Sequence, residues 1–175
     1  MSFIMHQGAG FGPGAPVVPG RERFADRYGK SPELAKYTVF LVEDDSMDRN
    51  IILQTLQRSP YIHNVHWFET GDRMLQHFVH EGYYSGTLIS SIPTLVLLDV
   101  ALPGVDGMEI LRRLKDNPLT AEIPVMMITG NMSDTQARDA FRLKASAFIG
   151  KPLHLDRVHE VMFTGWSWPT PPFGP

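Results

Sequence analysis

Side chains that could bind a divalent cation and a phosphoryl group occur at four separate places in this 175-residue chain, each directly after a short apolar run. They are Glu43 with Asp44, Asp99, Thr129 and Lys151. Clustered carboxylates repel one another and need a cation, and oxygen ligands without histidine or cysteine favour a hard ion such as Mg²⁺. A hydroxyl and an ammonium beside them suit an anion such as a phosphoryl group on Asp99. Each residue alone would be an ordinary polar surface group, so their recurrence after apolar runs is what predicts a site.

The apolar runs before these residues have the length and branched composition of strands that are covered on both faces. The expected strands are 38–42, 64–68, 94–98, 123–128 and 147–150. The expected helices between and after them are 46–56, 72–80, 108–115, 133–143 and 153–162. This alternation implies right-handed crossovers and an α/β fold, a three-layer sandwich in which helices cover both faces of a five-stranded parallel sheet. In such sheets ligands bind outside the carboxyl ends of the strands, which is where the four places lie.

The sequence also predicts how two of the helices begin. The first helix has four apolar residues at helical spacing, namely Met47, Ile51, Ile52 and Leu56. Asp45 or Ser46 is suited to cap its first turn. After the third strand, Pro103, Gly104 and Gly107 interrupt regular structure, so the chain is expected to turn sharply before the third helix.

Composition excludes several classes of partner. The net charge is −3 and the isoelectric point is about 6.1, so no basic surplus is present to hold a nucleic-acid backbone. The chain contains no cysteine, and no apolar run approaches the roughly 20 residues of a membrane span. The stretch that begins at Met1 lacks the basic region followed by an apolar region that is typical of a secretory signal. We therefore expect a cytoplasmic protein that has no membrane span and does not bind nucleic acid.

Three segments fall outside the alternation. Residues 1–36 begin with a Gly- and Pro-rich stretch typical of a mobile arm and could form a short helix before the domain. Residues 82–92 lengthen the connection between the second helix and the third strand, and residues 166–175 form a tail that contains Pro and Trp. We assign the globular domain to residues 37–165 and expect no output domain after it.

The motifs LVEDD, LLDVALPGVDG, ITG and IGKP occur in the order found in receiver domains of two-component response regulators, which residues 37–165 resemble. The resemblance implies the flavodoxin-like receiver fold, with strand order 2-1-3-4-5. It also implies that Asp99 is the phosphoacceptor and that Thr129 and Lys151 act on the phosphoryl group.

The same resemblance implies Mg²⁺ as the cofactor. The implied ligands are Glu43, which acts largely through water, Asp44, Asp99 and the backbone carbonyl of Ala101. A pair made of Asp44 and Asp45 is an alternative. The arginine that follows the acidic pair in the family, Arg49 here, is in register only when Glu43 is paired with Asp44.

The resemblance further implies a two-state switch. Phe148 takes the place of the family's rotating aromatic residue, and Thr129 would move towards the new phosphoryl oxygens together with it. The residues with structural roles are Pro103, Gly107 and Pro152. Pro152 is expected to follow a cis peptide bond that fixes the approach of Lys151.

The implied function is a signalling switch and not a turnover enzyme. The phosphoryl donor would be a sensor histidine kinase or a histidine phosphotransfer protein. The output would be a change in association with a downstream protein or with a second copy of the chain.

Three other interpretations fit the sequence less well. A pseudo-receiver scaffold that needs no phosphorylation usually lacks an acid, the Thr or the Lys, and none is missing here. An aspartate-nucleophile phosphatase of the haloacid dehalogenase type requires an Asp where this chain has Ala101. Two H-x-x-H spacings, His63 with His66 and His77 with His80, suggest a structural zinc site. Residues three apart on a strand face opposite sides, so only the helical pair His77 with His80 could chelate readily.

Overall fold

The five apolar runs form one parallel sheet in the computed structural model, which describes residues 37–80, 93–131 and 133–164. Its strands are β1 (Tyr37–Val42), β2 (Ile62–Phe68), β3 (Leu95–Asp99), β4 (Val125–Thr129) and β5 (Ala147–Gly150). They lie side by side in the order β2-β1-β3-β4-β5, so the predicted fold class and strand order are confirmed. The predicted arm, the lengthened connection and the tail lie outside the described residues.

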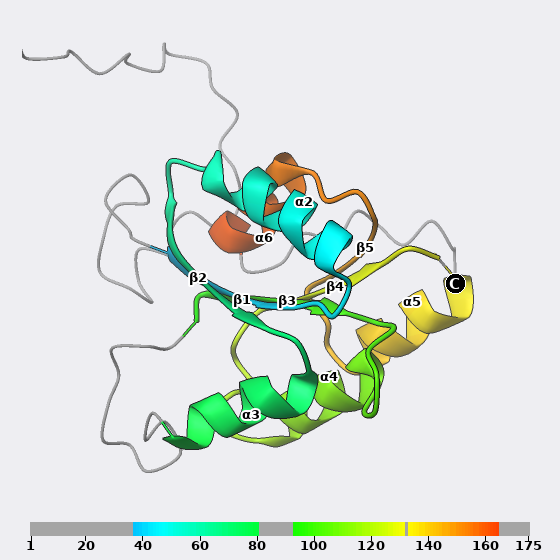
Figure 1. Ribbon diagram of the computed structural model, residues 1–175. Helices are drawn as coiled ribbons and strands as arrows, with labels where there is room; N and C mark the ends of the chain where they lie inside the picture. The colour runs from blue at the N-terminus through cyan, green and yellow to red at the C-terminus, as the bar shows by residue number, and fades with distance from the viewer. Residues whose placement is uncertain (1–36, 81–92, 132, 165–175) are drawn as a thin grey trace, which may run out of the picture.

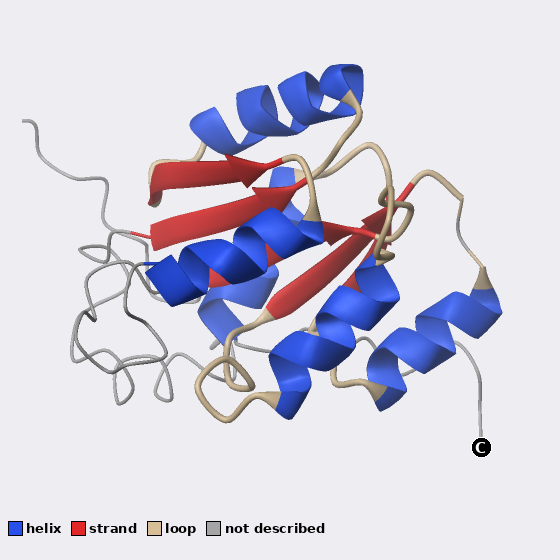
Figure 2. Ribbon diagram, turned by 60° about the horizontal axis from the view of Figure 1, so that its bottom comes forward, coloured by secondary structure: helices blue, strands red, loops and turns tan. Residues whose placement is uncertain are grey.

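Five helices alternate with the strands and cover both faces of the sheet (Figure 1). They are α2 (Ser46–Gln57), α3 (Gly71–His80), α4 (Gly107–Asp116), α5 (Asp134–Arg142) and α6 (Leu155–Thr164). Helices α2 and α6 lie on one face. Helices α3, α4 and α5 lie on the other, and Figure 2 shows these three in front of the sheet. None of the described helices combines the length and apolar character needed to cross a bilayer.

Successive strand residues point to opposite faces, so each strand contributes to two separate cores. The face covered by α3, α4 and α5 receives Phe40, Val42, Val96, Leu98, Val125 and Met127. The face covered by α2 and α6 receives Val39, Leu41, Leu95, Leu97, Met126 and Ile128. These side chains are almost completely buried. Packing on both faces holds the strands in register, and therefore fixes the relative positions of their carboxyl ends.

Most predicted boundaries differ from the structure by one or two residues. Strand β4 begins at Val125 and not at residue 123, because Ile123 belongs to a turn in which its N–H donates to the Thr120 carbonyl at 3.0 Å. The Lys115 ammonium donates to the carbonyls of Ala121 and Ile123 and fixes this turn. Helix α6 begins at Leu155, two residues later than predicted.

The predicted apolar stripe of the first helix is only half buried. Ile52 and Leu56 pack against the sheet, whereas 73% of Met47 and 49% of Ile51 is exposed. On a helix of 3.6 residues per turn, residues four apart share a face, and Ile51 lies about 100° away from Ile52. Of the two predicted caps, Asp45 is the one used, because its carboxylate accepts from the N–H groups of Met47 and Asp48.

The turn between β3 and α4 brings the first residue of the helix against the last residue of the strand. The Gly107 N–H donates to the carbonyl of Val100 at 3.0 Å, and a Cβ at Gly107 would overlap the Asp99 carbonyl oxygen. Gly104, in the same connection, has a positive φ of 79°, a conformation that glycine adopts readily. The backbone that carries Asp99 therefore depends on the absence of a side chain at Gly107.

We expect Gly107→Ala to lower the free energy of unfolding by about 1–3 kcal/mol, the usual range for overpacking, because the obstacle is backbone that cannot rotate away. Urea unfolding measures the change. The matched control is Gly130→Ala, where a Cβ meets nothing within 4 Å and the expected change is no more than about 1 kcal/mol in either direction. Equal unfolding midpoints for the two variants would contradict the close approach at Gly107.

Candidate functional site

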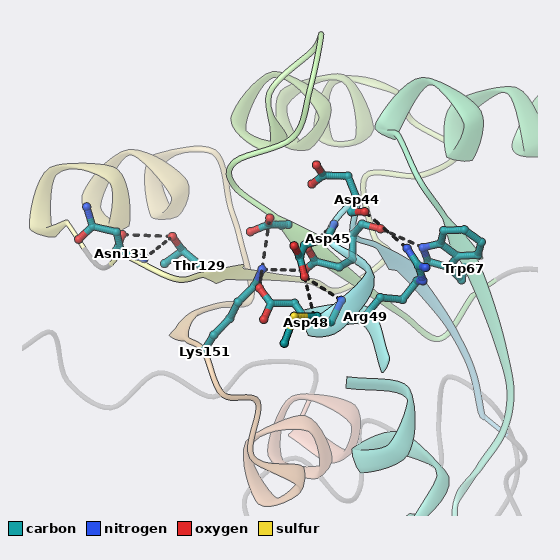
Figure 3. Close-up of polar contacts among 11 residues, drawn as sticks. Asp44, Asp45, Asp48, Arg49, Trp67, Thr129, Asn131 and Lys151 are labelled. Carbon is teal, nitrogen blue, oxygen red and sulfur yellow. Dashed lines mark hydrogen bonds and ion pairs between the residues drawn. The ribbon is translucent and has the colours of Figure 1, made fainter. Parts of the chain in front are cut away.

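The carboxyl ends of β1, β3 and β5 bring three acids and one ammonium together (Figure 3). Glu43 and Asp44 follow β1, Asp99 ends β3 and Lys151 follows β5. The Lys151 Nζ lies 2.8 Å from Glu43 Oε2 and 3.4 Å from Asp99 Oδ2. The Lys151 N–H also donates to the carbonyl of Thr129 at 2.7 Å, which anchors the loop after β5 to β4. Four of the five predicted polar residues therefore come together at this edge of the sheet, and the fifth, Thr129, ends the strand between β3 and β5.

The three acids form a compact oxygen cluster. One carboxylate oxygen from each of Glu43, Asp44 and Asp99 lies within 4.8 Å of the others. Glu43 and Asp99 are buried and Asp44 is exposed. Burial, followed by the charge of Asp99, raises the pKa of Glu43 to about 6, although the ammonium of Lys151 partly offsets this rise. The carboxylates of the cluster therefore repel one another, and a bound metal cation would reduce this repulsion.

One oxygen of the phosphoacceptor candidate has no protein partner. Asp99 is 4% exposed, and among the described residues its Oδ1 atom accepts no hydrogen bond. A buried carboxylate oxygen without a partner is costly, and a bound cation relieves that cost. Because every ligand in the cluster is oxygen, the donor set fits a hard divalent ion such as Mg²⁺.

The structure distinguishes the two acidic pairs that the sequence left open. Asp45 is used as the cap of α2, and its N–H donates to Glu43 Oε1 at 3.2 Å. The acids that share a cluster with Asp99 are Glu43 and Asp44. Asp45 therefore shapes the loop and is not a member of the cluster.

A stacked pair holds the backbone of the acidic loop from the outside. The Arg49 guanidinium lies 4.0 Å from the centre of the Trp67 ring and donates to the Asp44 carbonyl at 3.5 Å. The Trp67 indole N–H donates to the Glu43 carbonyl at 2.9 Å. Sequence reasoning placed Arg49 in the motif but gave no role to Trp67, which is 24 residues from Glu43 in the chain and lies beside it because β1 and β2 pair.

Asp48 is a member of the site that sequence reasoning missed. Its Oδ2 atom lies 2.7 Å from Lys151 Nζ, closer than either Glu43 or Asp99. A signal for it was present, because Asp48 lies four residues before Ile52 and therefore on the helix face that meets the sheet. Burial lowers the pKa of the Lys151 ammonium, but the surrounding carboxylates outweigh burial and raise it above its ordinary value.

The predicted switch residues are both buried and lie beside the cluster in the sheet. The Thr129 hydroxyl donates to the Asn131 carbonyl at 3.1 Å and accepts from the Asn131 N–H at 3.2 Å. Figure 3 shows this hydroxyl turned towards the loop that follows β4. Phe148 pairs with Met127 in the sheet and packs in the core beneath α3, α4 and α5.

The remaining predicted site residues lie in the two loops that flank the cluster. Ala101 and Pro103 are exposed in the connection between β3 and α4. The peptide bond between Lys151 and Pro152 is cis.

One histidine of each predicted pair lies beside one of the other pair. His66 of β2 and His77 of α3 have ring centroids 5.6 Å apart, and both rings pack on Phe40. The side chain of His80 is outside the described part of the structure. Within that part, the group of three or more metal-binding side chains is the acidic cluster.

Comparisons with known proteins agree with the geometry. A family model for the response regulator receiver domain matches residues 39–163. The probable methanogenesis regulatory protein FilR2 of Methanothrix harundinacea is 31% identical over 138 residues, which cover 75% of this chain and 86% of FilR2. Response regulator Rcp1 of Synechocystis is 28% identical over 124 residues, which cover 71% of this chain and 82% of Rcp1. The crystal structure of the phosphorylated cyanobacterial phytochrome response regulator RcpA matches with a TM-score of 0.60 and 29% identity, over 73% of this chain and 89% of that chain.

We expect Mg²⁺ to stabilise the protein, because the ion would relieve repulsion within the cluster. At about 100 times its dissociation constant, a ligand of the folded state adds about 2.7 kcal/mol to the free energy of unfolding. In Asp44→Asn the dissociation constant for Mg²⁺ should rise at least severalfold, and the stabilisation at a fixed Mg²⁺ concentration should fall accordingly.

Urea unfolding with Mg²⁺ and with EDTA measures this effect. Asp45→Asn is the matched control, since it removes the same charge from the same loop and asparagine caps a helix as well as aspartate does. A stabilisation by Mg²⁺ that is equal in the two variants would contradict the assignment of Asp44.

Proposed function

Because this chain belongs to the response regulator receiver domain family of two-component signalling, we propose that Asp99 accepts a phosphoryl group from a sensor histidine kinase or a histidine phosphotransfer protein in a Mg²⁺-dependent reaction. The observation that carries the proposal is the buried Asp99 carboxylate, whose Oδ1 has no hydrogen-bond partner among the described residues and whose Oδ2 lies 3.4 Å from Lys151 Nζ. RcpA is described as phosphorylated, which supports the same chemistry for this chain.

The residues proposed to hold Mg²⁺ are Glu43, Asp44, Asp99 and the carbonyl of Ala101. When bound, the ion supplies positive charge beside the phosphoryl oxygens. The cluster of carboxylate oxygens supports the first three assignments, and Ala101 follows Asp99 by two residues in an exposed connection.

In the proposed transfer, an oxygen of Asp99 forms a bond to phosphorus while the bond from phosphorus to the imidazole nitrogen of the donor breaks. The nitrogen keeps the electron pair, so the carboxylate needs no general base. The transition state for phosphoryl transfer is loose, and the protein contributes mainly position and charge. Lys151, already 3.4 Å from Asp99 Oδ2, would neutralise charge on the transferred group. Water later hydrolyses the acyl phosphate.

The phosphoryl group is proposed to act as a switch. Its new oxygens would offer the Thr129 hydroxyl an alternative to the Asn131 backbone, to which the hydroxyl is now bonded. Movement of Thr129 would open space beside Phe148 and bias the surface formed by α5, β5 and α6. A second polypeptide, either a downstream partner or another copy of the chain, would read that surface. In this proposal residues 37–165 are the receiver domain, residues 1–36 and 166–175 are accessory segments, and the protein acts in the cytoplasm as a switch and not as a turnover enzyme.

We expect acetyl phosphate with Mg²⁺ to add one acid-stable and base-labile phosphate to the protein, and we expect EDTA to prevent this addition. Asp99→Ala should take up no label, because the nucleophile is gone. Intact-protein mass spectrometry measures the uptake. Asp45→Asn should still be labelled, because Asp45 caps a helix and lies outside the cluster. Labelling of Asp99→Ala at the wild-type rate would show that the phosphoacceptor is another residue.

We expect the phosphoryl mimic beryllofluoride to change the association of the wild-type protein with itself or with a captured partner. Thr129→Val should bind the mimic and show a much smaller change, because it lacks the hydroxyl that would move. Thr129→Ser keeps the hydroxyl and serves as the control. Sedimentation and affinity capture at micromolar concentrations measure association. If wild-type protein with bound mimic associates as it does without it, the scaffold interpretation is favoured over the switch.

A further inference from the structure

The Lys151 ammonium is shared among three carboxylates, and its shortest contact is not with the proposed phosphoacceptor. Asp48 Oδ2 lies 2.7 Å from Lys151 Nζ, which is a hydrogen-bonded ion pair, whereas Asp99 Oδ2 lies at 3.4 Å. The distance to Asp99 exceeds the range of about 2.7–2.9 Å that is usual for a charge-assisted hydrogen bond. In this structure the ammonium is therefore held more closely by Asp48, and by Glu43 at 2.8 Å, than by Asp99.

Both ends of the contact between Asp48 and Lys151 are fixed by rigid elements. Asp48 is in the first turn of α2, where its N–H donates to the Asp45 carboxylate at 2.9 Å. The following turns of that helix are anchored by the buried residues Ile52 and Leu56. The Lys151 backbone is anchored to β4 through the Thr129 carbonyl. The ammonium therefore bridges the first turn of α2 and the loop after β5, and Figure 3 shows this bridge between Asp48 and Lys151.

The exposure of the two groups differs in a way that allows an exchange of partners. The Asp48 side chain is 40% exposed and the Lys151 side chain is 14% exposed. If the ammonium moved towards Asp99, water could hydrate the carboxylate of Asp48 at modest cost, because half-exposed ion pairs are weak. The long, flexible lysine side chain has enough freedom to make such a move while its backbone stays in place.

We propose that Asp48 is a positioning residue that competes with the phosphoryl group on Asp99 for the Lys151 ammonium. In the resting state Asp48 holds the ammonium away from Asp99. After phosphorylation the new oxygens must draw the ammonium from Asp48, so Asp48 weakens the hold of Lys151 on the phosphoryl group and limits the stability of the phosphorylated state. This inference rests on the proposed phosphorylation of Asp99.

The test compares beryllofluoride binding, in the presence of Mg²⁺, by full-length wild-type protein, Asp48→Asn and Asp45→Asn. Both variants remove one negative charge from the start of α2. Both should therefore attract an anion more strongly, and both lose the favourable interaction of that charge with the N-terminus of the helix. Of these two aspartates, Asp48 is the one that forms an ion pair with Lys151. We expect Asp48→Asn to bind the mimic about threefold to tenfold more tightly than Asp45→Asn, where tenfold corresponds to about 1.4 kcal/mol.

A second measurement shows whether the effect passes through Lys151 and needs no metal. Double-mutant cycles in EDTA, with Lys151→Met as the partner substitution, give the coupling free energy of each aspartate with the lysine from urea unfolding. The coupling of Asp48 should exceed that of Asp45. Equal mimic affinities for the two asparagine variants, or equal couplings, would overturn the role of Asp48 and leave the proposed function intact. Failure of the wild-type protein both to bind beryllofluoride and to take up phosphate would instead overturn the proposed function, and this inference with it.

Discussion

The geometry of the acidic site depends on one largely buried ammonium. Without Lys151, the carboxylates of Glu43, Asp48 and Asp99 would face one another across a region of low dielectric, where like charges are costly. The ammonium makes this arrangement tolerable and joins the end of β5 to β1, β3 and α2. Because the same cation is the group proposed to hold a phosphoryl anion, the contact that stabilises the resting site is also the one that phosphorylation would rearrange. Structure and switching therefore depend on the same side chain.

The sheet supplies the accuracy that this contact needs. The strands are buried on both faces, so their ends cannot slide without disturbing two cores. The connections at the carboxyl edge carry the chemistry, and close approaches such as that of Gly107 to the Asp99 carbonyl keep them tight. The rigid sheet and the connections that carry the chemistry meet at the last residue of each strand.

Much of this arrangement could be predicted from sequence, because two periodicities determine it. Strands buried on both faces give apolar runs, helices give a period of 3.6, and parallel strands place their carboxyl ends at one edge. These rules located Asp99, the acids after β1 and Lys151. They could not decide between Asp44 with Asp45 and Glu43 with Asp44, since that choice depends on which carboxylate turns to cap the helix.

The features that were missed depend on contacts between side chains distant in sequence. The bond from Trp67 to the Glu43 carbonyl exists only because β2 pairs with β1. The bridge from Asp48 to Lys151 joins residues 103 positions apart. The exposure of Met47 and Ile51 was also missed, because apolar spacing alone does not show how wide a stripe the sheet covers. In each case the local pattern was correct and the partner was set by tertiary packing.

The stacked pair of Trp67 and Arg49 has a consequence for which substitutions the site can accept. Both groups bond to backbone carbonyls of the acidic loop and not to its carboxylates. These two bonds do not involve the side chain of Asp44, whereas the Glu43 side chain itself accepts from the Asp45 N–H and so helps to hold the loop. A substitution at the exposed Asp44 can therefore alter the charge of the site, and with it the ion it prefers, while the bonds from Trp67 and Arg49 to the main chain remain. The residues that hold the loop backbone from outside are therefore different from the carboxylate that can change the charge of the site.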